Sequence, residues 1–158
     1  MLKKIILSFF LLFISTKPLY SAIEEKIINN FSKINNLNFD FKQTIGEKTE
    51  EGNCTIEYPK KIFCLYNNQN KKVMVSNGRS LAIKNQASNQ YYLYPLKKTP
   101  LNLLLDKNFL IDKIKNLNSR IIDNKYINFT IKNNNNEINI FFDKKTLNLI
   151  GWQTEDIY

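Results

Sequence analysis

Apolar and polar residues alternate along the middle of the chain, from residue 52 to residue 94. Valine, leucine and isoleucine alternate with polar or small residues on both sides of Asn77-Gly78. An Asn-Gly pair between two alternating runs is a strong hairpin signal, because both residues tolerate positive φ. The pattern predicts an antiparallel meander that includes strands on both sides of Pro59 and an aromatic strand at 90–94. A sheet of this kind must cover one face, and what packs there bears on function.

The period of the pattern changes on either side of this meander. From Ile23 to Asn36 apolar residues recur at helical spacing, which predicts an amphipathic helix of about three to four turns. The period then becomes two over 37–45, which predicts a strand. Further on, Thr99-Pro100 predicts a helix start, with the threonine as N-cap and the proline at the first helical position. The leucines that follow make the next turn apolar nearly all round, and a second helical piece is expected after Asp106.

Strand-like runs resume in the last third of the chain, at 121–122, 126–131, 138–142 and 147–153. The total is about ten short strands with two helical segments, one before the sheet and one inserted in it. A sheet of that many strands curls toward a barrel, and helices across its mouth would close it. The expected fold is mainly β (α+β): an incomplete antiparallel β-barrel closed by helices, with a hydrophobic cavity.

Residues 1–21 have the features of a cleavable secretory signal. Two lysines precede an apolar run, Ile5 to Ile14, and this run leads to the small residues Ser21 and Ala22. The run is shorter than the roughly 20 residues that span a bilayer, and an N-terminal anchor helix is the alternative. Cleavage would leave a domain of residues 22–158, remove three lysines and lower the formal charge from +9 to +6. No second apolar stretch approaches spanning length, so we expect a soluble mature protein.

Cys54 and Cys64 are the only cysteines, and export would place them where disulfides persist. They lie on opposite sides of the Pro59 turn with the same parity. A three-residue turn would therefore set them face to face across a hairpin, which predicts a disulfide. A register slip of one residue would instead separate them.

The residues that most enzymes need are missing or scattered. The sequence has no histidine, the commonest general base and metal ligand at neutral pH, and its four glycines form no phosphate-binding pattern. A pair of carboxylates for glycoside cleavage could be drawn from four residues that lie in alternating strands or turns, where a solvated charge is the default: Asp40, Glu57, Glu137 and Asp143. We expect no enzymatic activity, no cofactor and no metal site.

The positive charge raises the question of an anionic partner, because cationic excess can mark nucleic-acid or membrane binding. Lysine, asparagine and isoleucine are all abundant, as in 133–136, which indicates a bias in nucleotide composition. The lysines are also scattered, without an arginine-rich run. A basic barrel that stacks single-stranded nucleic acid on aromatic residues is a rival hypothesis, but export argues against it. We expect a monomer without a nucleic-acid partner.

Several short motifs, in this order after the signal and the first helix, resemble those of one family. They are Phe39-Asp40-Phe41-Lys42-Gln43, Gly52, Tyr58-Pro59, Val75-Ser76-Asn77-Gly78, Thr99-Pro100-Leu101-Asn102-Leu103-Leu104 and Leu149-Ile150-Gly151-Trp152. Together they resemble the LolA family, the periplasmic carriers of outer-membrane lipoproteins. The resemblance covers nearly the whole chain after the signal.

The resemblance implies a carrier in the periplasm of a Gram-negative bacterium, whose cavity shields the acyl chains of a lipoprotein on its way from the inner to the outer membrane. It implies three partners: acylated lipoproteins, an inner-membrane lipoprotein-releasing complex and an outer-membrane receptor. Each buried methylene contributes about 0.8 kcal/mol, so full burial of several acyl chains would prevent release. The carrier must therefore bury the chains only partly, or must have a lid whose own apolar contacts compete with the cargo. We expect the cavity to be lined by Phe39, Phe41, Tyr58, Tyr92 and Tyr94. The expected lid residues are Ile27, Phe31, Ile34, Leu101, Leu103, Leu104 and Leu105.

Two features depart from the family pattern. Tyr58 stands where the family usually has an arginine that latches the lid, so the latch is expected to be weaker or built elsewhere. The family has at least one more strand after the tryptophan matched by Trp152. Because the chain stops at Tyr158, the C-terminal strand is expected to be missing, in a fragment or a shortened variant. The alternative function is a periplasmic lipoprotein sensor or adaptor of the same architecture.

Overall fold

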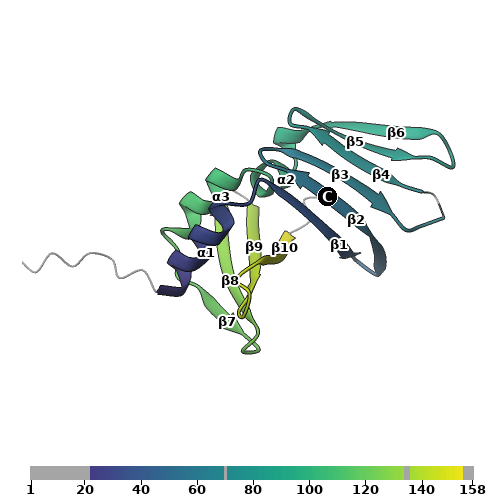
Figure 1. The fold of residues 1–158 in the computed structure, drawn as a ribbon. Coiled ribbons are helices and arrows are strands. Elements are labelled where there is room, and N and C mark those ends of the chain that lie inside the picture. Colours follow the sequence, from purple (N-terminus) through teal and green to yellow (C-terminus); the bar gives the residue numbers. More distant parts are fainter. Residues whose placement is uncertain (1–21, 70, 134–135, 155–158) are drawn as a thin grey trace, which may run out of the picture.

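The computed structural model describes residues 22–69, 71–133 and 136–154 (Figure 1). This part of the chain contains three α-helices, one 3₁₀ helix and ten strands, and the strands form two antiparallel sheets. The expected signal peptide, residues 1–21, lies outside the described residues. Mainly β structure with few helices agrees with the expected fold class.

The first sheet has six strands that pair in the order of the sequence. They are β1 (Asn36–Ile45), β2 (Lys48–Glu57), β3 (Lys61–Tyr66), β4 (Val73–Asn77), β5 (Ser80–Asn85) and β6 (Gln90–Pro95). The hairpin predicted at Asn77-Gly78 is confirmed. Gly78 has a positive φ of 91°, and the side-chain oxygen of Asn77 accepts hydrogen bonds from the backbone N–H groups of Arg79 and Ser80.

Strand register places rows of mostly apolar side chains on one face of this sheet, which we call the inner face. Residues that pair directly across antiparallel strands point to the same side. One row contains Leu37, Ile56, Ile62, Ser76, Leu81 and Tyr94. The next row contains Phe39, Cys54, Cys64, Met74, Ile83 and Tyr92. The opposite face is the outer face.

The second sheet has four strands in the order β10-β9-β8-β7. They are β7 (Arg120–Ile122), β8 (Tyr126–Asn133), β9 (Asn136–Asp143) and β10 (Leu149–Thr154). Helices α1 (Ala22–Ser32) and α3 (Lys107–Ile114) cover one of its faces (Figure 1). The core between them includes Ile27, Phe31, Leu110, Ile114, Ile127, Phe129, Ile131, Ile138, Ile140 and Phe142.

A short helical segment connects the two sheets. It contains η1 (Leu96–Lys98) and α2 (Leu101–Leu104), and α2 lies where the sheets approach each other (Figure 1). Thr99 is not the N-cap that the sequence predicts. Pro100 takes that place without a side-chain cap, while the Thr99 hydroxyl donates to the carbonyl of Leu96, 2.8 Å away, and so ends η1.

The expected barrel is not closed. Among the described strands, β1 and β10 are edges of separate sheets and form no hydrogen-bonded ladder with each other. The physical reason lies in the inserted helices, which take the chain from β6 to a different sheet before β7 begins. Each sheet therefore has its own apolar core.

Candidate functional site

Three of the five residues expected to line a cavity lie along the β1–β2 side of the inner face. Phe39 and Phe41 are half-buried on β1, and Tyr58 directly follows β2; all three pack against the core of the six-stranded sheet. Tyr92 and Tyr94 share the inner face, but they lie on the edge strand β6 and are 55% and 37% exposed. The five residues thus mark an apolar surface that is covered at one end and open at β6.

The aromatic rings of this surface meet edge to face. The Phe41 and Tyr66 rings lie 4.9 Å apart between centroids, and the Phe39 ring lies 6.0 Å from that of Trp152 on β10. Trp152 was not among the predicted site residues, although its motif was recognised. Gly52 leaves room for this packing, because a Cβ there would lie 2.7 Å from the Phe41 ring.

The residues expected to form a lid divide between the two cores. Ile27, Phe31 and Leu104 are buried in the core of the four-stranded sheet. Leu105, the next residue after Leu104, is fully buried in the core of the six-stranded sheet. The remaining three are half-buried against the first of these cores: Ile34, Leu101 and Leu103. The last residue of α2 and the residue that follows it therefore pack into different cores.

Tyr58 lies at the joint between the cores, and so do Leu101 and Trp152, since each packs against both clusters. The Tyr58 ring meets the Phe31 ring edge to face, with centroids 5.8 Å apart. Its hydroxyl oxygen is buried and has no hydrogen-bond partner in the described part of the chain. Burial raises the pKa of this hydroxyl to about 12. An unpaired buried hydroxyl costs about 1–3 kcal/mol, so this group lowers the stability of the packed joint.

Lys107, the first residue of α3, ties this joint to the end of α1. Its ammonium group donates to the carbonyl oxygens of Ser32 and Ile34, 2.9 and 2.7 Å away. It also lies 5.9 Å from the centre of the Tyr58 ring. The last carbonyls of a helix lack partners and carry the negative end of its dipole, so a cation there is stabilising. A charged contact is thus present beside Tyr58, although Tyr58 itself carries no charge.

A second tie joins the turn after β2 to the helical segment. The backbone N–H of Lys60 donates to the carbonyl of Leu105 at 2.8 Å, and the Lys60 ammonium lies 3.4 Å from the Asp106 carboxylate. Asp106 also accepts a hydrogen bond from the backbone N–H of Phe109 and caps α3. The Lys60 contacts and Lys107 are thus both close to Tyr58, where the turn after β2 meets the helical segment.

The inner face ends in a charged cluster at the strand ends farthest from α2. The Glu50 carboxylate, only 8% exposed, pairs with Lys72 and with Lys48. Burial raises the pKa of this carboxyl, but the hydrogen bonds and charges of the two lysines outweigh burial and lower it overall. The Lys72 ammonium lies 3.7 Å from the Tyr66 ring centre. The sequence pattern does not predict this cluster. Its one sign there is a polar residue, Gln43, on the apolar side of β1, and Gln43 accepts a hydrogen bond from the Tyr66 hydroxyl.

A disulfide joins Cys54 and Cys64 across β2 and β3, with Cα atoms 4.1 Å apart. The two residues pair directly in the ladder and are both buried at the inner face. The bridge lies between Phe39 and Met74 in its row, so it fixes the middle of the apolar surface.

The four carboxylates considered for catalysis are not brought together. Each has a separate partner: Asp40 accepts from Asn53, Glu57 pairs with Lys61, Glu137 pairs with Lys132, and Asp143 accepts from backbone N–H groups of its own turn. In the described ranges, no three residues of the types His, Cys, Asp and Glu are grouped so that they could hold a metal ion.

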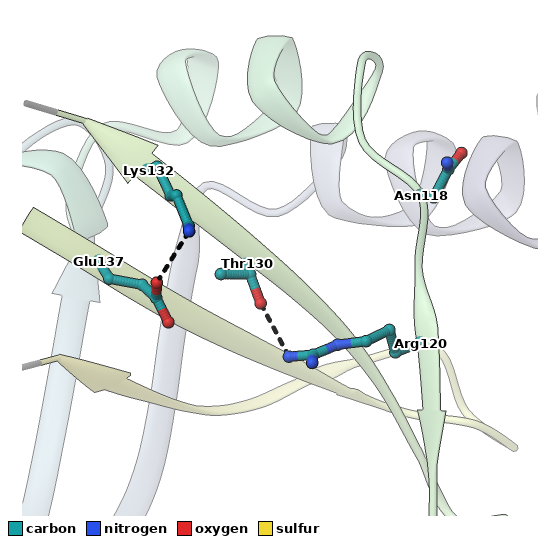
Figure 2. A pocket seen from close by; sticks show the side chains of 5 residues that line it. All are labelled: Asn118, Arg120, Thr130, Lys132 and Glu137. Atoms are coloured by element: carbon teal, nitrogen blue, oxygen red, sulfur yellow. Dashed lines mark hydrogen bonds and ion pairs between the residues drawn. The ribbon is translucent and has the colours of Figure 1, made fainter.

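A hollow of about 430 Å³ lies on the outer side of the four-stranded sheet (Figure 2). It is lined by Asn118, Arg120, Thr130, Lys132 and Glu137. The Arg120 guanidinium donates to the side chains of Asn128 and Thr130, and Lys132 lies 3.7 Å from Glu137. Because its polar groups bind one another, this hollow does not fit an apolar ligand. Within the part of the chain that the structure describes, no helix has the length and hydropathy to cross a membrane.

Comparison with known families gives one match. The sequence model of the family described as "Outer membrane lipoprotein carrier protein LolA" matches residues 32–158. This range contains both sheets, α2, α3 and the joint around Tyr58. No curated protein matches the chain.

Proposed function

Because the chain belongs to the LolA family of outer membrane lipoprotein carrier proteins, we propose that it binds the acyl chains of lipoproteins and carries them from the inner to the outer membrane. The family match over residues 32–158 supports a carrier or chaperone role. The joint between the two cores is the observation that supports acyl binding in particular. At this joint an apolar sheet face contacts a short leucine-rich helix. A hydrophobic ligand could replace the contacts that the helix makes with the sheet.

In this proposal the acyl chains enter between the inner face of the six-stranded sheet and the helical segment. Phe39 and Tyr58 line the side near the helical segment, Phe41 lies toward the Glu50 cluster, and Tyr92 and Tyr94 line the open edge at β6. Each methylene taken from water contributes about 0.8 kcal/mol, which makes binding strong even when only part of each chain is buried. The buried charged cluster around Glu50 would bound the apolar surface at its far end.

The lid consists of α2 with its flanking residues and the apolar face of α1. Leu104 and Leu105 leave opposite cores when α2 moves, so displacement of this one helix would open both sides of the joint. Ile27, Phe31, Ile34, Leu101 and Leu103 complete the lid. Opening would also expose these leucines to water, and this cost offsets part of the gain from the cargo and keeps release possible.

The partners in this proposal are acylated lipoproteins, an inner-membrane complex that releases them and an outer-membrane receptor that takes them. Transfer requires only a receptor of higher affinity, so the protein acts in the periplasm without catalysis or a cofactor. Cleavage of residues 1–21 would deliver it there.

Mass spectrometry of protein purified from its native envelope tests the proposal. We expect triacylated peptide to accompany the wild-type protein and to be reduced about tenfold in Leu104→Lys, which places a charge in the lid. Tyr92→Ser changes an exposed residue, so it should keep the fold while it weakens binding. Ile121→Lys, at an exposed position on β7, is the matched control and should bind normally. Wild-type protein without acylated peptide, or equal loading of all four proteins, would refute the proposal.

A further inference from the structure

The outer face of the six-stranded sheet changes character between β2 and β3. On the first two strands its residues are polar or charged, among them Asn38, Asp40, Asn53 and Thr55. On β3 to β6 they are mostly apolar and in register: Phe63, Val75, Ala82 and Leu93 in one row, and Leu65, Val73 and Tyr91 in the next. We call these seven residues the outer patch. A sheet face exposed to water normally carries polar side chains, so the patch needs an explanation.

The outer patch is open to solvent. Tyr91 and Leu93 on the edge strand are 70% and 63% exposed, and Phe63, Leu65 and Val75 are also exposed. Strands β5 and β6 lie on the far side of the molecule from α1 and the four-stranded sheet, so no described element covers the patch (Figure 1). Contiguous exposed apolar surface of this kind marks a site of interaction.

The chain segment that carries the patch has charges of one sign. Between Glu57 and Asp106 the sequence contains no aspartate or glutamate, but it has seven lysines and one arginine. A bias in nucleotide composition accounts for many lysines, yet it does not exclude acidic residues from one segment only. Three of the lysines form ion pairs with residues outside the segment. The other cations are exposed and have no ion pair in the described part of the chain: Lys71, Arg79, Lys84, Lys97 and Lys98.

These free cations lie within and beside the patch. Lys84 completes the second row, between Val73 and Tyr91. Lys97 and Lys98 lie in η1, which follows β6. The Arg79 carbonyl accepts a hydrogen bond from the backbone N–H of Leu96 at 2.8 Å, which places Arg79 beside them. Apolar, aromatic and cationic side chains thus share β3 to β6, and the nearest acidic residues of this face, Asp40 and Glu57, lie on the neighbouring strands β1 and β2.

We propose that the outer patch docks on the surface of an anionic lipid bilayer. Tyrosine and leucine enter the interfacial region of a bilayer, and each lysine or arginine near an anionic surface adds about 1 kcal/mol of attraction. Reversible membrane binding requires such a combination of apolar and cationic contributions. A second copy of the chain fits less well, because a two-fold contact would bring two sets of the same cations together. This proposal does not depend on acyl binding at the inner face.

Sedimentation with lipid vesicles tests the docking surface. The experiment uses protein purified from the cells that naturally produce it, after any processing that occurs there. We expect binding to phosphatidylcholine vesicles that contain about 30% phosphatidylglycerol, little binding to pure phosphatidylcholine, and weakening as salt rises above about 0.1 M. Tyr91→Ser with Leu93→Ser, and separately Lys84→Gln with Lys97→Gln and Lys98→Gln, should each reduce binding about tenfold. All five positions are exposed, so the fold should persist, and thermal unfolding verifies this.

Matched controls change the same residue types elsewhere. Tyr126→Ser on β8, and Lys113→Gln with Lys115→Gln and Lys125→Gln, should bind vesicles as the wild type does. Absence of vesicle binding, or equal effects of patch and control variants, would overturn the docking proposal. The proposal would also be overturned if the protein did not bind vesicles but self-associated or bound an acidic protein, and the patch variants abolished that interaction. Acyl binding measured on the same proteins is expected to stay unchanged, which separates this proposal from the carrier function.

Discussion

Phe39 of β1 and Trp152 of β10 pack edge to face, with ring centroids 6.0 Å apart and ring planes at 82°. Their strands are edges of different sheets and share no hydrogen-bonded ladder. The ring contact therefore joins the two halves at the position where a closed barrel would have continuous backbone pairing. Side chains can separate here without the loss of a ladder, so the proposed entry of a ligand would break no backbone pairing between the sheets.

A double-mutant cycle measures this contact. We expect Phe39→Leu and Trp152→Leu to be non-additive in the free energy of unfolding, with a coupling of about 0.5–1.5 kcal/mol from urea denaturation. Phe39→Leu combined with Phe129→Leu, in the other core, should be additive. Additivity of the first pair would mean that the ring contact does not join the halves.

Lys107→Met should loosen the end of α1. The variant removes hydrogen bonds to the carbonyls of Ser32 and Ile34, so we expect the free energy of unfolding to fall by about 1–2 kcal/mol. Amide hydrogen exchange should also quicken in α1. Lys115→Met, at an exposed position that follows α3, is the control and should have little effect. If the two variants behave alike, Lys107 is not the tie between α3 and α1.

Tyr58→Phe should stabilise the unliganded protein. The substitution keeps the ring on Phe31 and removes a buried hydroxyl that has no described partner. We expect the free energy of unfolding to rise by about 1 kcal/mol in urea denaturation. Tyr126→Phe, at a more exposed hydroxyl, should be neutral. A lower stability of Tyr58→Phe would show that the hydroxyl is hydrogen-bonded after all.

Glu50→Gln should destabilise the protein in a pH-dependent manner. We expect a loss of about 1–2 kcal/mol at neutral pH, because Lys72 and Lys48 lose their charged partner. The folded pKa of Glu50 lies below its ordinary value of 4.5, so its contribution is complete above that value and is lost as the pH falls through the folded pKa.

Urea denaturation of both proteins across the acid range checks this sign. The difference in free energy of unfolding between wild type and Glu50→Gln should be constant above about pH 6 and shrink below pH 4.5. A difference that grows on acidification would contradict the described ion pairs.

Features with a local cause could be predicted from the sequence. The Asn77-Gly78 hairpin depends on the positive φ of Gly78 and on the side-chain oxygen of Asn77, which accepts hydrogen bonds within the turn. The pairing of Cys54 with Cys64 depends on a three-residue turn that fixes register. Helix α1 also follows from apolar spacing, although it ends at Ser32, before the predicted end at Asn36.

Features that depend on distant contacts could not be predicted. Alternation shows that a strand has an apolar face, but it does not tell which sheet the strand joins, so the division into two sheets was missed. The burial of Leu104 and Leu105 in opposite cores, and the reach of Lys107 to the end of α1, arise only when the helices pack. Tyr92 and Tyr94 were predicted to line a cavity, but their position on an edge strand leaves them open to water.

Photo-cross-linking at neighbouring residues of β1 tests the acyl-binding account most directly. Phe39 faces the helices from the inner face, whereas the adjacent Asn38 points to the outer face. A photoreactive side chain at Phe39 should capture a triacylated peptide in solution, and the same side chain at Asn38 should not. Equal capture at both positions, or capture at neither, would contradict the account.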